Sequence, residues 1–178
     1  MTPKQADLIR RSFDAIWPVR RKIASRFYRR FFELAPDAQR LFPSDMERQH
    51  LKLMDMIAAI VGALDERELF RSIIGHTGRQ HARFGVNPSH FVAFGDALIW
   101  SLEHQFGPAF TPELREAWIA LYNAVRSEMI RAAQDAAFER GATLFLRHPS
   151  FLAAPLSCKL GQNARLMPAK YARLSWGR

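Results

Sequence analysis

Apolar residues recur at spacings of three and four along most of the first 138 positions, which is the period of an amphipathic α-helix. No convincing alternation of the kind expected for strands interrupts this pattern. The sequence therefore predicts an all-α fold of about six main helices. Their inward faces are Ile9/Phe13/Ile16/Trp17, Ile23/Phe27/Phe31, Leu53/Ile57/Ile60/Val61/Leu64, Phe70/Ile73/Ile74/Thr77/His81, Phe91/Phe94/Leu98/Leu102 and Trp118/Leu121/Tyr122/Val125/Met129.

Capping residues and prolines indicate where these helices begin. Thr2-Pro3, Asn87-Pro88 and Thr111-Pro112 each place a capping side chain before a proline at the first helical position. Ser44 with Glu47 matches a capping box and predicts the start of a long helix. The segment PDAQRLF is expected to form one short turn of helix that ends at Phe42.

The pattern changes after Ala137. We expect one domain over residues 1–137, followed by an irregular tail over 138–178. Residues 139–178 hold seven Lys/Arg and one Glu, so they supply +6 of the net charge of +9. The basicity thus belongs mainly to the tail, and no nucleic-acid partner is expected. The apolar clusters of the tail are compatible with contact to a partner protein or to an acidic membrane surface.

Composition limits the kind of core, the kinds of metal site and the cellular location that we expect. The 178 residues include 14 Phe, which indicates a strongly aromatic core or a core that encloses something flat and apolar. The single cysteine, Cys158, excludes an internal disulfide and any four-cysteine metal site. The charged N-terminal residues do not resemble a signal peptide, and no apolar run has the length of a membrane span. We therefore expect a cytoplasmic protein.

His81 is the main candidate for chemistry. It follows Phe70, Ile73 and Thr77 on the apolar face of its predicted helix. By itself this pattern fits a buried core histidine at least as well as a metal ligand. Zinc-type Cys/His spacings, nucleophile motifs and phosphate-binding loops are absent from the sequence.

Four segments taken together change that balance: FYRRFFELAPDAQRLF (27–42), QHLKLMDMIAAIV (49–61), GRQHARFGVNPSHF (78–91) and AWIALY (117–122). In this order and spacing they resemble the globin family, and within it the bacterial single-domain globins and the globin part of flavohaemoglobins. The resemblance covers roughly residues 3 to 133 and implies a globin fold that encloses haem. Because no Cys-x-x-Cys-His is present, the haem is expected to be non-covalent haem b.

On the proximal side, the resemblance implies that His81 is the axial iron ligand. A neutral imidazole suits this role and leaves the opposite position open for a diatomic gas. Its other ring N–H is expected to be held by a backbone carbonyl near Thr77. Phe42 matches the phenylalanine that globins stack on the porphyrin, and the remaining apolar wall is expected to come from Phe84, Val86, Phe91 and Phe94.

On the distal side, the matching residues are Tyr28, Gln49 and Leu53. Gln49 and Leu53 are one helical turn apart and would point into one pocket, which Tyr28 would reach from the second helix. The phenol and the amide would donate hydrogen bonds to bound dioxygen and slow its release. His50 is the alternative: a register shift of one would make it a sixth ligand, and otherwise it is expected to be solvated. His76, His90, His104 and His148 are expected at the surface.

Three functions remain open on this basis. The first is reversible oxygen binding for transport or storage, with O2, NO and CO as gas ligands. The second is nitric oxide dioxygenation with an external reductase, and the third is a haem-based gas or redox sensor that signals through the tail. Flavohaemoglobins have a Tyr and a Glu in the hydrogen-bond network of the proximal histidine, and this chain has Phe91 and Ala133 at the matching places. A weaker electron push counts against peroxidase-like chemistry.

Overall fold

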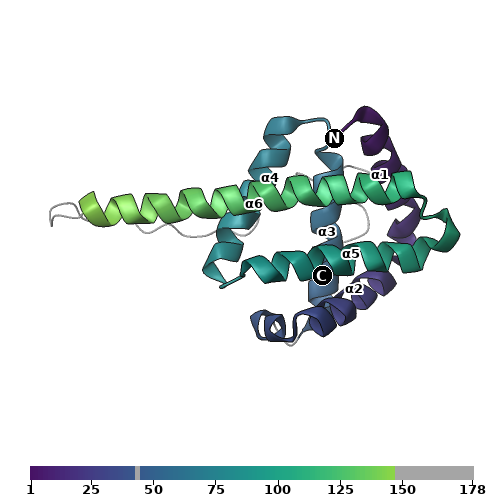
Figure 1. The fold of residues 1–178 in the computed structure, drawn as a ribbon, viewed down its shortest axis with the longest axis horizontal. Coiled ribbons are helices and arrows are strands. Elements are labelled where there is room, and N and C mark those ends of the chain that lie inside the picture. The colour runs from purple at the N-terminus through teal and green to yellow at the C-terminus, as the bar shows by residue number, and fades with distance from the viewer. Residues whose placement is uncertain (43–44, 147–178) are drawn as a thin grey trace, which may run out of the picture.

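A computed structural model describes residues 1–42 and 45–146. The described residues form six α-helices and three short 3-10 helices and contain no strand, so the predicted all-α fold class is confirmed (Figure 1). The elements are α1 (Pro3–Ile16), η1 (Trp17–Val19), α2 (Arg20–Leu34), η2 (Pro36–Leu41), α3 (Met46–Gly62), α4 (Arg67–Arg83), α5 (Pro88–Phe106), η3 (Gly107–Ala109) and α6 (Pro112–Leu146).

Most of the predicted helix starts are confirmed. Thr2 forms a capping box with Gln5 at the start of α1, and the Asn87 side chain caps α5. The start of α3 differs from the prediction, because its N-cap is Asp45, whose carboxylate accepts a hydrogen bond from the Arg48 N–H at 3.2 Å. Ser44, the predicted cap, lies outside the described residues. Asp and Ser are similarly good caps, so the sequence alone does not separate the two.

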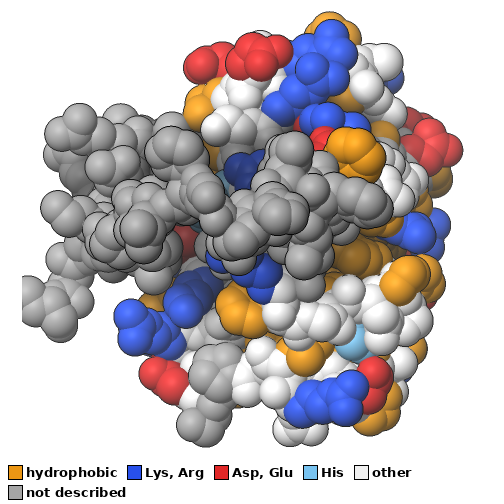
Figure 2. Space-filling view, turned by 90° about the vertical axis from the view of Figure 1, so that its left-hand side faces the viewer, with side chains coloured by type: hydrophobic (Ala, Val, Ile, Leu, Met, Phe, Trp, Pro, Cys, Tyr) orange, Lys and Arg blue, Asp and Glu red, His pale blue; other side chains and the backbone are white. Residues whose placement is uncertain are grey.

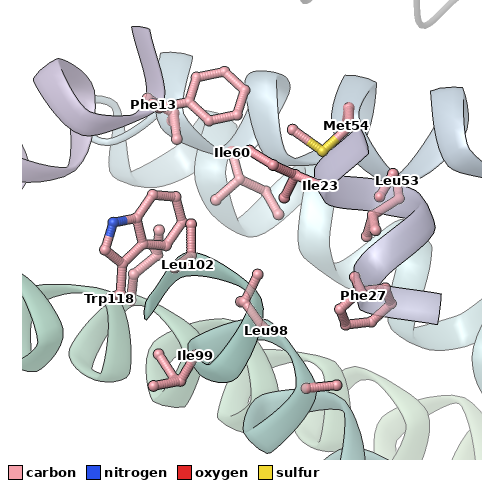
Figure 3. Close-up of a cluster of buried hydrophobic side chains, with 14 of the residues drawn as sticks. Phe13, Ile23, Phe27, Leu53, Met54, Ile60, Leu98, Ile99, Leu102 and Trp118 are labelled. Atoms are coloured by element: carbon pink, nitrogen blue, oxygen red, sulfur yellow. The ribbon is translucent and has the colours of Figure 1, made fainter. Parts of the chain in front are cut away.

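The core is one continuous cluster of apolar side chains from all six α-helices. Figure 3 shows Phe13 and Trp118 near one end of the cluster drawn there, and Phe27 and Leu53 near the other. At the first end the indole N–H of Trp118 donates to the Ser12 hydroxyl at 3.0 Å, and that hydroxyl donates to the Ile9 carbonyl. This chain of hydrogen bonds satisfies a polar group inside the core and ties α6 to α1.

Helices α4 and α6 approach each other closely at Gly78. A Cβ atom built on Gly78 would lie 2.6 Å from the Met129 carbonyl oxygen, a backbone atom with no rotamer to change. One turn earlier, a Cβ on Gly75 would meet only Arg79 at 3.5 Å and Ala132 at 3.9 Å. Glycine at 78 therefore lets α4, which carries His81, lie directly on the backbone of α6.

Helix α6 is longer than the sequence pattern predicts. It continues past Ala137 to Leu146 and extends beyond the other helices in Figure 1. The expectation of irregular structure over 138–146 is therefore wrong. Alanine, leucine, glutamate and arginine favour a helix there even without a sustained apolar face. The remainder of the predicted tail, 147–178, lies outside the described residues.

Charged groups are dispersed over the visible surface. Figure 2 shows Lys and Arg side chains in several separate groups, with acidic and apolar side chains between them. Some of these charges form ion pairs, such as Arg21 with Glu47 at 2.9 Å and the half-buried Arg10 with Asp65 at 2.6 Å. Among the described helices, none is both long enough and apolar enough to cross a membrane.

The approach at Gly78 gives a test of the packing. Gly78→Ala is expected to lower the free energy of unfolding by about 1–3 kcal/mol, because α4 and α6 must separate to admit the methyl group. Gly75→Ala is the matched control on the same helix and should be neutral or stabilising by about 0.5–1 kcal/mol, since alanine has the higher helix propensity. Urea unfolding of both variants measures the difference. Equal stability of the two would contradict the proposed close packing.

Candidate functional site

His81 lies in the last turn of α4 and is half-buried. Its Nδ1 atom is 2.9 Å from the Thr77 carbonyl oxygen, so the predicted backbone contact is confirmed. A carbonyl only accepts, so Nδ1 must carry the proton and Nε2 keeps a free lone pair. Burial lowers the pKa of His81, and the bond to Thr77 opposes that shift. The side chain is thus held as a neutral imidazole with one nitrogen available as a donor to a metal.

Thr77, the residue that orients His81, is held in turn by two helices. Its hydroxyl donates to the Ile73 carbonyl at 2.9 Å and lies 3.9 Å from the Met56 sulfur of α3. This contact places the middle of α4 against the middle of α3. The orientation of the imidazole therefore depends on the packing between these two helices.

Gln49 and His81 lie at corresponding ends of α3 and α4. Residues 63–66 connect the two helices, and each of the two side chains is about 20 Å along its helix from that connection. Each side chain therefore lies in the half of its helix that is farther from the connecting segment.

Tyr28 and Gln49 contact each other directly. The Gln49 amide nitrogen donates to the Tyr28 hydroxyl oxygen at 3.1 Å, although the residues belong to α2 and α3. Tyr28 is only 4% exposed, and burial raises its pKa to about 12 in spite of the bond from Gln49. The phenol is therefore protonated at neutral pH, and its O–H is free to donate. Leu53, one turn after Gln49, is buried as predicted.

His50 lies beside the same tyrosine. Its ring stacks on the Tyr28 ring with centroids 5.5 Å apart, and its Nδ1 is 3.7 Å from a Glu47 carboxylate oxygen. The side chain is only 14% exposed, so the expectation that His50 is solvated is wrong. Gln49 hydrogen-bonds to the tyrosine hydroxyl, whereas His50 packs on the ring face. This geometry favours Gln49 as the residue that faces a ligand together with Tyr28.

Aromatic rings surround the Tyr28 side chain. The Phe42 ring lies at the end of η2, with ring centroids 5.4 Å from Tyr28 and Phe32 and 6.0 Å from Phe31. The Phe94 ring of α5 also contacts Phe31, with ring centroids 5.8 Å apart. The predicted wall residues Phe42 and Phe94 thus share one aromatic neighbour and belong to the same side of the core.

Of the remaining predicted wall residues, Phe84 and Val86 lie in the connection after α4, and Phe91 lies in the first turn of α5. Val86 and Phe91 are half-buried, whereas Phe84 is 62% exposed at the C-terminal end of α4. The Val86 N–H donates to the His81 carbonyl at 3.4 Å, so the segment after α4 folds back against the helix end. Ala133, the residue at the place of the flavohaemoglobin glutamate, is half-buried in α6.

Tyr122 is a residue of this region that the sequence did not predict as part of the site. Its hydroxyl donates a short hydrogen bond to the Phe91 carbonyl, and its ring stacks on Phe94 at 5.9 Å. Gly95 makes room for this ring, because a Cβ there would lie 2.5 Å from a Tyr122 ring carbon. The motif AWIALY contains Tyr122, but its partner is known only once α5 and α6 are packed.

His90 is not the surface group that the sequence predicts. It is 3% exposed, and its Nε2 lies 2.9 Å from an Asp37 carboxylate oxygen. The hydrogen bond from His90 holds the pKa of Asp37 below its usual range. His76 and His104 are exposed as expected, and His148 lies outside the described residues. The capping sequence Asn87-Pro-Ser-His90 indicates locally that His90 takes part in the start of α5. The contact with Asp37 is not predictable in this way, because Asp37 is distant in sequence.

The side chains on this side of the molecule suit haem. His81 offers one neutral nitrogen, and the neighbouring aromatic rings offer flat apolar surfaces. Within the described residues, no group of three or more His, Cys, Asp or Glu side chains comes together as a metal site. His81 would hold the iron of a haem, and the porphyrin would supply the ligands that the protein does not.

Comparisons with known proteins agree with this geometry. The Globin family model matches residues 25–129. Neuroglobins of Danio rerio and Tetraodon nigroviridis are each 30% identical over an alignment of 145 residues that covers 74% of this chain and 91% of theirs. Neuroglobin of Chaenocephalus aceratus is 29% identical over 143 residues, covering 72% of this chain and 90% of its own. With the family model matched over more than half of its length, the chain belongs to the globin family.

Proposed function

We propose that this globin binds dioxygen reversibly on non-covalent haem b, with His81 as the axial ligand and Tyr28 and Gln49 as hydrogen-bond donors to the gas. The observation that carries the proposal is the 3.1 Å hydrogen bond from the Gln49 amide to the Tyr28 hydroxyl. It brings two polar donors from different helices together beside a cluster of aromatic rings. Haem, when bound, supplies an iron with one axial position open to a diatomic ligand.

Tyr28 is the stronger of the two donors. Its oxygen already accepts from Gln49, and a hydroxyl that accepts one hydrogen bond becomes a better donor in the next. Because the side chain is buried, water competes little for the phenol proton. The Tyr28 O–H can therefore donate to a gas ligand without first giving up a hydrogen bond to water. Slow release and high affinity follow from this arrangement.

The proximal side favours binding over bond cleavage. The Nδ1–H of His81 donates to a neutral backbone carbonyl. A carbonyl attracts this proton less strongly than a carboxylate would, so it makes the imidazole less electron-rich. Phe91 and Ala133 have no polar side-chain atom with which to strengthen that network. The imidazole is thus a modest electron donor, which suits reversible gas binding. Within the globin family, the Tyr28, Gln49 and Leu53 set supports a place beside the bacterial single-domain globins.

Removing the Tyr28 hydroxyl tests this function. Tyr28→Phe is expected to raise the dioxygen dissociation rate about 10- to 100-fold, since a hydrogen bond worth about 1.5–3 kcal/mol is lost. Gln49→Leu should have a smaller effect in the same direction, because Gln49 also acts through Tyr28. Stopped-flow displacement of dioxygen by carbon monoxide gives the rates. Gln39→Leu, on the exposed side of η2, is the control. An unchanged rate in Tyr28→Phe would rule out the distal assignment.

The raised pKa of Tyr28 leads to a pH prediction. With a pKa of about 12, the phenol keeps its proton and its donor role up to about pH 11. The dioxygen dissociation rate should therefore be flat between pH 7 and pH 10 and should increase only above that range. A tyrosine with an ordinary pKa near 10 would instead lose its donor within the range. An increase in the rate centred near pH 10, absent in Tyr28→Phe, would contradict the predicted burial.

A further inference from the structure

Asp37 and His90 form a polar contact between η2 and the start of α5. The His90 side chain is 4% exposed, and its Nε2 is 2.9 Å from the Asp37 carboxylate, which is 53% exposed. On the other side of the ring, the Asn87 backbone N–H donates to Nδ1 at 3.3 Å. Nδ1 therefore accepts and Nε2 donates, so the ring is held in one tautomer and one orientation.

Asp37 and Phe42 are connected through η2. Asp37 lies in this short 3-10 helix and Phe42 is its C-cap residue, and the turn is held by hydrogen bonds from the Ala38 N–H to the Ala35 carbonyl and from the Phe42 N–H to the Gln39 carbonyl. Ala38 is fully buried beneath this turn. A displacement of Asp37 is thus passed along the segment to Phe42, the predicted porphyrin-stacking residue.

His90 is connected in the same way to the opposite wall. It lies in the first turn of α5, directly before Phe91 and one turn before Phe94. This part of α5 is anchored on α6, because Tyr122 donates to the Phe91 carbonyl and stacks on Phe94. The α5 end of the contact is therefore fixed, and it is the η2 segment that the contact restrains.

Between these two walls the other contacts are apolar. The Phe31 ring touches Phe42 at 6.0 Å and Phe94 at 5.8 Å, but ring contacts do not fix a spacing strongly. Across the described ranges, Asp37 makes the one hydrogen bond or ion pair that joins a side chain of η2 to another element. We infer that the Asp37–His90 pair is a clamp that positions Phe42 against the N-terminal part of α5 and thereby slows the loss of haem.

This inference rests on the proposed haem contacts of Phe42 and Phe91. Asp37 and His90 are positioning residues, since they act on the cofactor through these neighbours. Phe42 precedes α3 along the chain and is not part of a long helix. Without the clamp, η2 would be free to move outward from α5, and haem would leave more readily.

Transfer of haem from the ferric protein to excess apomyoglobin at pH 7 tests the clamp. Asp37→Ala is expected to increase the rate of haem loss about three- to ten-fold, as for one charge-assisted hydrogen bond that is partly exposed to solvent. Asp37→Asn keeps an oxygen acceptor for the His90 N–H and should stay within about two-fold of the unmodified protein. Asp7→Ala removes an exposed carboxylate paired with Arg11 on α1 and serves as the control.

Two further measurements separate positioning from general stability. Urea unfolding of the apoproteins should show Asp37→Ala and Asp7→Ala to be similarly stable, and Asp37→Ala should have no added effect in a His90→Gln background. Haem loss from Asp37→Ala at the unmodified rate, or the same acceleration in Asp7→Ala, would overturn the inference while leaving the proposed function intact. An unmodified protein that takes up no haem would overturn the proposed function itself.

Discussion

The hydrogen bond between His81 Nδ1 and the Thr77 carbonyl is the interaction on which the rest of the site depends. It fixes the tautomer of the imidazole, and it points the remaining nitrogen in one direction from the end of α4. Thr77 is itself held against Met56 of α3, and α4 lies on α6 because Gly78 has no side chain. Three helices thus determine where a single nitrogen atom lies. A buried histidine without these contacts would have two nitrogens of similar availability.

The opposite side of the site is organised by a buried phenol. Burial favours the protonated form of Tyr28, and Gln49 occupies the oxygen lone pair rather than the proton. These two effects leave one O–H donor in an otherwise aromatic region. The same aromatic rings extend through Phe31 to Phe42 and Phe94, so the polar donor and the apolar walls form one continuous cluster. Affinity for a gas and retention of a flat cofactor therefore depend on neighbouring parts of the same core.

The sequence predicts the helices well because their signals are local. Thr2, Asn87 and Thr111 cap helices as predicted, and the Thr77 contact follows from the spacing of one helical turn. The end of α6 was predicted too early, because residues with good helix propensity continue the helix there without a sustained apolar stripe. His90 and Tyr122 were missed as site residues for a different reason: their partners, Asp37 and Phe91, are brought to them only by the packing of separate elements. His50 likewise is shielded by a ring that lies on another helix.

The optical spectrum of the ferrous protein without gas tests the central assignment most directly. His81 as the one axial ligand predicts a five-coordinate, high-spin spectrum that is lost in His81→Ala. His76→Ala, which removes an exposed histidine of the same helix, should leave that spectrum unchanged. A six-coordinate, low-spin spectrum that His50→Ala converts to five-coordinate would contradict the account, because it would place His50 rather than a gas on the distal side.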